Sequence, residues 1–328
     1  MRDRLQEWTE RALAGGVLSA DEGLALLGAE GVDLGYLLAG AQRIRQHFKG
    51  DRIALCSIIN AKSGRCSENC AFCAQSLHHR AKSPVYDLKP SQEIVAGARA
   101  AAEQGCHCYG IVTSGARLTP GPEMDRLLEA LREIRATTSV RPSASLGLLD
   151  RQAATALAEA GCVVYHHNLE TARSFFPSIC TTHEYEQDLE TVRVAKLAGM
   201  TVCCGGLFGL GESAAQRVEL ALTLRELQVD SVPINFLAPV KGTPLAGQRQ
   251  LSPMDCLRII ALYRYMLPGC QISVCGGREL NLGEFQSWIF MAGASGMMVG
   301  NYLTMRGRDL QADLQMIEDA GLSHAACN

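Results

Sequence analysis

Short apolar runs alternate with longer amphipathic segments from about residue 51 onward. The apolar runs lie at 53–59, 108–113, 142–146, 163–168, 202–208, 231–237, 271–275 and 296–299. Segments of helical length separate most of them, as at 91–104, 122–137, 150–160, 185–198 and 213–227. Alternation of strands and helices is typical of a parallel sheet, and about eight such units favour an α/β fold of the (β/α)8 TIM-type barrel class. An open doubly wound sheet is the alternative.

The first fifty residues show a different pattern. Ser19 and Glu22 have the spacing of a capping box, and apolar residues recur after them at helical intervals. We therefore predict an N-terminal helical extension at 1–50, acting as a lid or plug, a barrel at 51–315 and a C-terminal tail at 316–328.

Composition narrows the possible functions. With 328 residues, 47% of them hydrophobic, the chain can bury a large core. The net charge is −3 and no basic block is present, so we expect no nucleic-acid partner. The charged N-terminus lacks an apolar leader and no run of about eighteen apolar residues occurs, so we expect no membrane span. Fourteen cysteines then indicate a reducing cytoplasm and metal or redox chemistry.

Three of the cysteines, Cys66, Cys70 and Cys73, have C-x3-C-x2-C spacing. One short loop therefore supplies three thiolates and no fourth. A cubane 4Fe–4S cluster has four corners, so this set leaves one iron open for a small molecule. Structural zinc takes four ligands, and His78 or His79 would have to complete such a site. The spacing favours the open cluster.

The cysteine spacing resembles that of radical S-adenosylmethionine (SAM) enzymes. In that superfamily the open iron binds the amino and carboxylate groups of SAM, and electron transfer releases a 5′-deoxyadenosyl radical. Four further strings accompany the cysteine string CSENCAFCAQS (66–76): YHHNLET (165–171), GGLFGLGES (205–213), VPINFLAPVKGTPL (232–245) and GRE (277–279). In this order the five strings closely resemble the biotin synthase family, over residues 41 to 310.

The resemblance implies a fold, a reaction and cofactors. It implies a radical SAM sulfurtransferase of biotin biosynthesis that inserts sulfur into dethiobiotin inside a (β/α)8 barrel. SAM and its 4Fe–4S cluster lie at the mouth, and a sacrificial auxiliary iron–sulfur cluster lies deeper. It also implies a cytoplasmic homodimer and an electron donor such as flavodoxin or ferredoxin. No catalytic side chain is expected beyond these cofactors.

Site residues follow from the same resemblance. Cys66, Cys70 and Cys73 would hold the SAM cluster. SAM contacts would come from Phe72, Glu170, Gly205, Leu207, Gly209 and Glu212. Substrate contacts would come from Asn168, Asn235 and His166. An amide can both donate to and accept from a cyclic urea, and a carboxylate can accept from ribose hydroxyls. His166 could donate to the ureido oxygen or simply pack at the strand end.

The chain departs from the family at the auxiliary cluster. The family's three cysteines and one arginine correspond to Gly110, Ser143, Cys203 and Ser273. Three of the four ligands are therefore missing. The family's arginine near the SAM carboxylate corresponds to Asp188, so another group must meet that charge.

New cysteines occur in the same region. Side chains alternate along a strand, so Cys108, two residues before Gly110, shares its inward face. Cys275, two residues after Ser273, follows the same parity, whereas Cys204 should point to the opposite face from Cys203. The resemblance adds Cys203, the retained family ligand, and Cys56, which lies where the family often has a serine facing the auxiliary cluster. The candidate ligands are therefore Cys56, Cys108, Cys203 and Cys275, with Cys106 and Cys204 as reserves. We expect a relocated auxiliary cluster, 4Fe–4S rather than the usual 2Fe–2S. No role is predicted for Cys162, Cys180, Cys256, Cys270 and Cys327.

Two alternatives stay open. The first is another radical SAM enzyme of this subgroup, a hydrogenase-cofactor maturase or a mutase that makes methylornithine, which would explain the lost ligands without a moved cluster. The second is an iron–sulfur carrier, which has no use for eight strand units and a pocket. Binding of SAM and dethiobiotin would distinguish all three.

Overall fold

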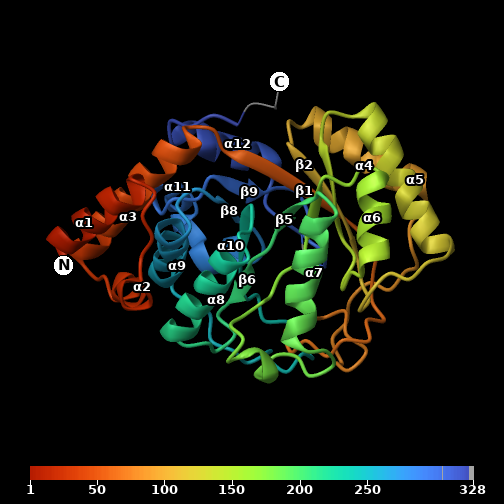
Figure 1. Ribbon diagram of the computed structural model, residues 1–328, viewed down its shortest axis with the longest axis horizontal. Helices are drawn as coiled ribbons and strands as arrows, with labels where there is room; N and C mark the ends of the chain where they lie inside the picture. The colour runs from red at the N-terminus through yellow and green to blue at the C-terminus, as the bar shows by residue number, and fades with distance from the viewer. Residues whose placement is uncertain (305, 325–328) are drawn as a thin grey trace.

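Nine parallel strands form a closed barrel in the computed structural model, which describes residues 1–304 and 306–324 (Figure 1). The strands are β1 (Ala54–Lys62), β2 (Cys108–Thr113), β3 (Arg141–Ser145), β4 (Val164–His166), β5 (Thr201–Cys203), β6 (Gly206–Phe208), β7 (Ser231–Phe236), β8 (Gln271–Val274) and β9 (Gly296–Met298). Their order is β5-β4-β3-β2-β1-β9-β8-β7-β6, and a pairing between β5 and β7 closes the ring. The predicted TIM-type barrel is confirmed.

The predicted apolar run at 202–208 forms two short strands, β5 and β6, which together occupy one barrel position. The chain bends between them at Cys204 and Gly205. A Cβ on Gly205 would lie 2.1 Å from the carbonyl oxygen of Pro233 on β7, so only glycine permits this close approach. The barrel therefore has eight positions built from nine strands.

Helices surround the strands. The barrel helices are α4 (Ser91–Glu103), α5 (Pro122–Thr137), α6 (Arg151–Glu159), α7 (Tyr185–Leu197), α8 (Ala214–Glu226), α9 (Pro253–Met266), α10 (Arg278–Leu282), α11 (Trp288–Met291) and α12 (Leu310–Asp319), with short 3-10 turns at Phe176–Ser178 and Gly283–Phe285. Side-chain caps mark several helix starts: Asp150 accepts from the Ala153 amide, and Ser213 accepts from the Gln216 amide. Among the described residues, no helix is both long and apolar enough to cross a membrane.

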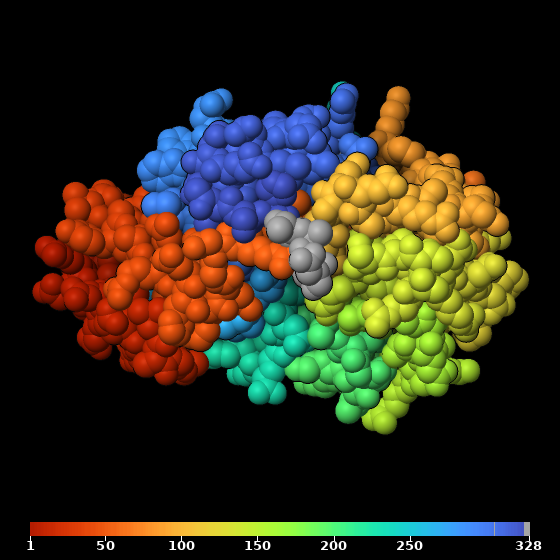
Figure 2. Space-filling model, turned by 90° about the horizontal axis from the view of Figure 1, so that it is seen from above, coloured from red at the N-terminus to blue at the C-terminus, as the bar shows by residue number. Residues whose placement is uncertain are grey.

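The N-terminal extension comprises α1 (Arg2–Leu13), α2 (Ala20–Leu27) and α3 (Val32–Lys49), and the predicted capping box of Ser19 and Glu22 is present. α2 packs on α8 and α9, and α3 packs on α9. Thr9 of α1 and Tyr265 of α9 hydrogen-bond at 2.7 Å. The extension forms one end of the molecule (Figure 2). It packs on the barrel helices and contributes no residue to the barrel cavity.

The C-terminal region is tied to the barrel. Arg278 of α10 donates two hydrogen bonds to Asp313 of α12, and both side chains are fully buried. The amide of Ile53 at the start of β1 donates to the carbonyl of Ser323. The boundary we expected at 315 falls inside α12. Leu322, which follows that helix, still packs against the hydrophobic core.

Candidate functional site

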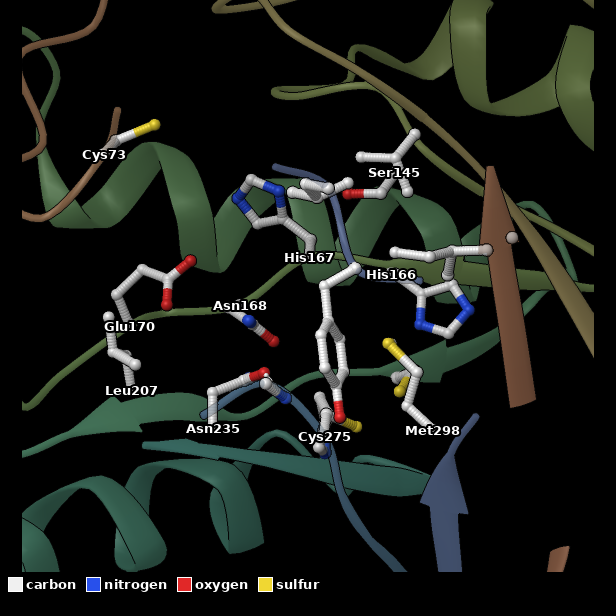
Figure 3. Close-up of a pocket in the computed structure, with 18 of the residues that line it drawn as sticks. Cys73, Ser145, His166, His167, Asn168, Glu170, Leu207, Asn235, Cys275 and Met298 are labelled. Carbon is white, nitrogen blue, oxygen red and sulfur yellow. Dashed lines mark hydrogen bonds between the residues drawn. The ribbon is translucent and has the colours of Figure 1, made fainter. Parts of the chain in front are cut away.

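A cavity of about 660 Å³ occupies the barrel interior and opens at the loops that follow the strands. This volume is typical of a cavity that encloses small molecules. Figure 3 shows Cys73 and Glu170 on one side of the view and His166, Cys275 and Met298 on the other. Asn168 and Asn235 lie between these two groups. The cavity therefore has two chemically different ends with amide side chains between them.

The loop after β1 brings Cys66, Cys70 and Cys73 to the cavity wall, where all three are half-buried. The Cys73 amide donates to the Cys70 carbonyl at 2.9 Å, and the Cys66 amide donates to the Gln75 carbonyl at 3.0 Å. The Gln75 side chain in turn accepts from the hydroxyl of Ser63 at 2.9 Å. These main-chain contacts hold three thiols on one short loop.

The two histidines considered for zinc do not join these thiols. His78 Nε2 lies 2.9 Å from the Ser67 carbonyl oxygen, and His79 Nε2 lies 3.0 Å from that of Cys70. Neither imidazole lines the cavity. The three cysteines, on a loop open to the cavity, suit an iron–sulfur cluster with one open iron.

Burial and a neighbouring thiol affect the protonation of Cys70 and Cys73. A hydrogen bond with Cys180 and burial raise the pKa of Cys70, and burial raises the pKa of Cys73. Thiols must lose their protons to bind iron, so loading this site releases protons.

Sequence reasoning missed a polar group beside this loop. Glu68, Cys180 and His183 approach one another at the cavity wall, and the Cys70 and Cys180 thiols are within hydrogen-bonding reach. His183 Nδ1 lies 2.6 Å from Glu68 Oε2, and its Nε2 lies 3.2 Å from Asp188 Oδ2. Cys180 follows a 3-10 turn and shows no periodic signal, so only the fold reveals its position.

Asp188 sits within this group as an anion with two imidazole partners. His167 Nε2 lies 2.8 Å from its other oxygen. Burial alone would raise the pKa of Asp188, but hydrogen bonds and charge from the two histidines lower it. Burial would lower the pKa of His183, yet Asp188, Cys180 and Glu68 raise it to about 11. Both nitrogens of His183 therefore face carboxylates, and the imidazole is held between Glu68 and Asp188.

Glu170 follows β4 at the cavity wall in a left-handed backbone conformation, with φ of 60°. Its carbonyl accepts from the Leu207 amide at 2.8 Å, which fixes the turn against β6. Burial and the charge of Asp188 raise the pKa of Glu170 to about 7. A strained residue with a shifted pKa in a cavity indicates a functional position.

The other predicted SAM contacts divide into two groups. Phe72 and Leu207 line the cavity with Glu170. Gly205, Gly209 and Glu212 do not line the cavity. The Glu212 carboxylate accepts from the amides of Gly209 and Leu210 and pairs with Arg217 at 2.8 Å, so it shapes the loop after β6. Direct contact of these three residues with SAM receives no support from their placement.

Asn168 and Asn235 both line the cavity. Asn168 Oδ1 accepts from the Gly205 amide at 3.2 Å. Asn235 Oδ1 accepts from the Gly276 amide at 3.0 Å, and its Nδ2 donates to the Gly206 carbonyl at 3.3 Å. Backbone groups therefore fix the orientation of both amides.

Four further thiols meet at the other end of the cavity. Cys56 and Cys108 are register partners on β1 and β2, and both pack with Cys203 of β5 in one cluster. Cys275 follows β8 directly and lines the same cavity. All four line the cavity, and Cys108, Cys203 and Cys275 are buried. Soft thiolates from four barrel strands or strand ends match the ligand set of an iron–sulfur cluster.

Three positions that we aligned with the family's auxiliary ligands, Gly110, Ser143 and Ser273, carry no thiol in this chain. A Cβ on Gly110 would lie 3.1 Å from Ile58 Cγ2 and 3.3 Å from Ser143 Oγ, so little space remains there. The Ser143 hydroxyl donates to the Tyr109 carbonyl at 3.0 Å and accepts from Cys108 Sγ at 3.2 Å. Ser273 lines the cavity but offers only a hydroxyl.

The reserve cysteines lie elsewhere. Cys106 and Cys204 are buried in the hydrophobic core between strands and helices and do not line the cavity. For Cys204 this agrees with its expected opposite face. Neither thiol is placed to join the other four.

Comparison with known proteins identifies the class. The Radical SAM superfamily model matches residues 61–224, and the Biotin and Thiamin Synthesis associated domain matches residues 233–323. Together with the three-cysteine loop, these matches define the protein as a radical SAM enzyme.

Relatives over the full length identify the family. The chain is 62% identical to the biotin synthase of Syntrophotalea carbinolica, with all of both chains covered. It is 59% identical to that of Geobacter sulfurreducens, with 97% of each chain covered. The chain belongs to the biotin synthase family.

Solved structures share the fold. Methylornithine synthase superimposes with a TM-score of 0.83 at 21% identity, and 97% of each chain is covered. A maturase of the [FeFe]-hydrogenase superimposes with a TM-score of 0.84 at 17% identity, covering all of this chain and 76% of that one. At such low identity these likenesses show the barrel alone.

Proposed function

We propose that this radical SAM enzyme inserts sulfur between two carbons of dethiobiotin to form biotin. The observation that carries the proposal is the presence of two separate thiol sets in one cavity. Cys66, Cys70 and Cys73 stand at one end, and four further cysteines stand at the other. A radical generator and a sulfur supply would thus flank the substrate.

The residues at the first end are suited to SAM. Cys66, Cys70 and Cys73 would hold a 4Fe–4S cluster, which when bound with SAM supplies reductive cleavage to a 5′-deoxyadenosyl radical. Glu170 would accept from the ribose hydroxyls, and Phe72 and Leu207 would contact the adenosyl group.

The residues in the middle are suited to dethiobiotin. Asn168 and Asn235 would exchange hydrogen bonds with its ureido ring, because an amide offers both a donor and an acceptor. The apolar cavity wall would exclude water from the reacting carbons, so that the radical meets the substrate alone.

The second end would hold the auxiliary cluster. Cys56, Cys108, Cys203 and Cys275 would be its ligands, and we propose 4Fe–4S as its type. The crowded backbone at Gly110 and the absence of a thiol at Ser143 and Ser273 support a cluster that lies away from the family's usual position.

We also propose a homodimer that takes electrons from a flavodoxin or a ferredoxin in the cytoplasm. Size-exclusion chromatography with light scattering tests the dimer, and single-turnover reduction by each donor tests the electron source.

The test of the reaction is anaerobic turnover of the reconstituted enzyme with SAM, dethiobiotin and a reductant. Biotin should form with about two 5′-deoxyadenosines for each product, one for each C–H bond broken. Formation of 5′-deoxyadenosine without any biotin would contradict the proposed substrate.

A further inference from the structure

His166 lies on β4, where it is the register partner of Cys203 on β5. Neighbouring partners in a parallel sheet project to the same side, and both residues line the cavity. Figure 3 shows the His166 ring on the side of the cavity where Met298 and Cys275 lie. The imidazole therefore belongs to the end that contains the four thiols.

The His166 ring contains an unsatisfied polar atom. Its Nε2 is buried and has no hydrogen-bond partner among the described residues. Buried polar groups in native proteins are nearly always satisfied, so an orphan nitrogen facing a cavity points to a group that binds there.

The neighbours of the ring show what that group is. Two thiols share this part of the cavity with the ring: Cys203 on β5 is the register partner of His166, and Cys108 on β2 lines the same wall. The two amides suited to the ureido ring, Asn168 and Asn235, instead bond to the backbone at Gly205, Gly206 and Gly276. The His166 ring therefore faces thiol groups rather than the two amides suited to the ureido ring.

We infer that His166 is a positioning residue for the auxiliary cluster. Its imidazole donates an N–H hydrogen bond to a sulfur atom bound between Cys108 and Cys203. This inference rests on the proposed function, in which these cysteines ligate a cluster. Imidazole carries an N–H in either neutral tautomer and in its charged form, so the donation does not depend on a titration. This hydrogen bond to sulfur, rather than contact with the substrate, is then the role of His166.

Hydrogen bonds to cluster sulfurs raise the reduction potential, because they stabilise the more negative reduced state. Removal of the donor should lower the potential of the auxiliary cluster without removing a ligand. Glutamine keeps an N–H donor on a side chain of similar reach, whereas leucine keeps the bulk alone.

The experiment begins from a parent variant that carries Cys66→Ala, Cys70→Ala and Cys73→Ala, so that only the auxiliary cluster is present. His166→Leu and His166→Gln are added separately to this parent. Iron content and the reduction potential are measured by EPR-monitored titration under anaerobic conditions. The iron content should match the parent in both, and the potential should fall with leucine and return toward the parent value with glutamine.

A second measurement distinguishes a role of His166 at the cluster from a role in substrate binding. Calorimetry on the otherwise native, cluster-loaded enzyme should show unchanged dethiobiotin affinity in His166→Leu, while Asn168→Ala serves as the control that weakens binding. An unchanged potential in His166→Leu would overturn the inference alone, as would weakened dethiobiotin affinity in that variant. Loss of the cluster from both His166 variants would make His166 a ligand and also overturn it. A parent that binds no iron would instead overturn the proposed auxiliary cluster, and this inference with it.

Discussion

Cys56 and Cys108 are register partners on the adjacent parallel strands β1 and β2, and both side chains line the barrel cavity. Cys108 also lies two residues before Gly110, the position that the resemblance aligns with the family's first auxiliary ligand. In the proposed relocated site, one step of the strand period would change the depth of a ligand side chain and keep its face.

Replacement of Cys70 by alanine should abolish reductive cleavage of SAM. The loop supplies three thiolates, and a cluster with two protein ligands would not be retained in its open form. The measurement is 5′-deoxyadenosine production with dithionite as reductant. Cys270→Ala is the matched control, because Cys270 lies outside the cavity and donates to the Val229 carbonyl. Normal 5′-deoxyadenosine production by Cys70→Ala would exclude this loop as the cluster site.

SAM affinity should rise with pH through the titration of Glu170. The pKa of this carboxyl is raised to about 7, so the neutral form dominates below pH 7. Ribose hydroxyls bond best to the ionised form, and the proton must leave when SAM binds. Affinity should therefore increase about tenfold between pH 6 and pH 8, as one group losing one proton requires.

Equilibrium dialysis at the two pH values measures this dependence. Glu170→Gln cannot titrate, so its SAM affinity should be nearly the same at pH 6 and pH 8. If the SAM affinity of Glu170→Gln changed with pH as it does in the native enzyme, the titration would belong to another group.

Asn235→Ala should weaken dethiobiotin binding. The substitution leaves a polar group of the ureido ring unpaired in a buried site, which costs about 1–3 kcal/mol. Calorimetry on the cluster-loaded enzyme measures the affinity, and Asn168→Ala should act in the same direction. Asn60→Ala is the control, because the Asn60 side chain does not line the cavity. Unchanged affinity in Asn235→Ala would reject its role in substrate recognition.

Asp313→Ala should lower the free energy of unfolding by about 3–5 kcal/mol, since it leaves the buried Arg278 guanidinium without its principal anion. Urea denaturation measures this change. Asp319→Ala, on the exposed end of the same helix, should change the free energy by less than about 0.5 kcal/mol. Equal effects of the two variants would show that the ion pair does not anchor α12.

The barrel was predictable because each strand and helix carries its own periodic signal. The run at 108–113 matches β2, and the segment at 122–137 matches α5. The break between β5 and β6 was not predictable, because it depends on the approach of Gly205 to Pro233, a contact between segments far apart in sequence. The packing of α2 and α3 on α8 and α9 was likewise not predictable, because an amphipathic helix does not indicate which helices it will contact.

The candidate site was predictable where spacing or strand parity carries information. The three-cysteine loop has a distinctive spacing. Strand parity placed Cys108 and Cys275, and the resemblance placed Cys56 and Cys203, on the cavity that all four line. Cys180 has neither signal, since the loop after a 3-10 turn follows no period. Its proximity to Cys70 and His183 is a product of the tertiary fold.

The central claim is that a second cluster occupies the far end of the cavity in a relocated site. Anaerobic iron and sulfide counting with Mössbauer spectroscopy, on the variant that lacks Cys66, Cys70 and Cys73, tests it most directly. We predict about four irons for each chain with 4Fe–4S character, and loss of that iron when Cys108 or Cys203 is also replaced. A Cys108→Ala variant that keeps Cys66, Cys70 and Cys73 should still cleave SAM but form no biotin. A variant without the SAM-loop cysteines that binds no iron after reconstitution would contradict the account.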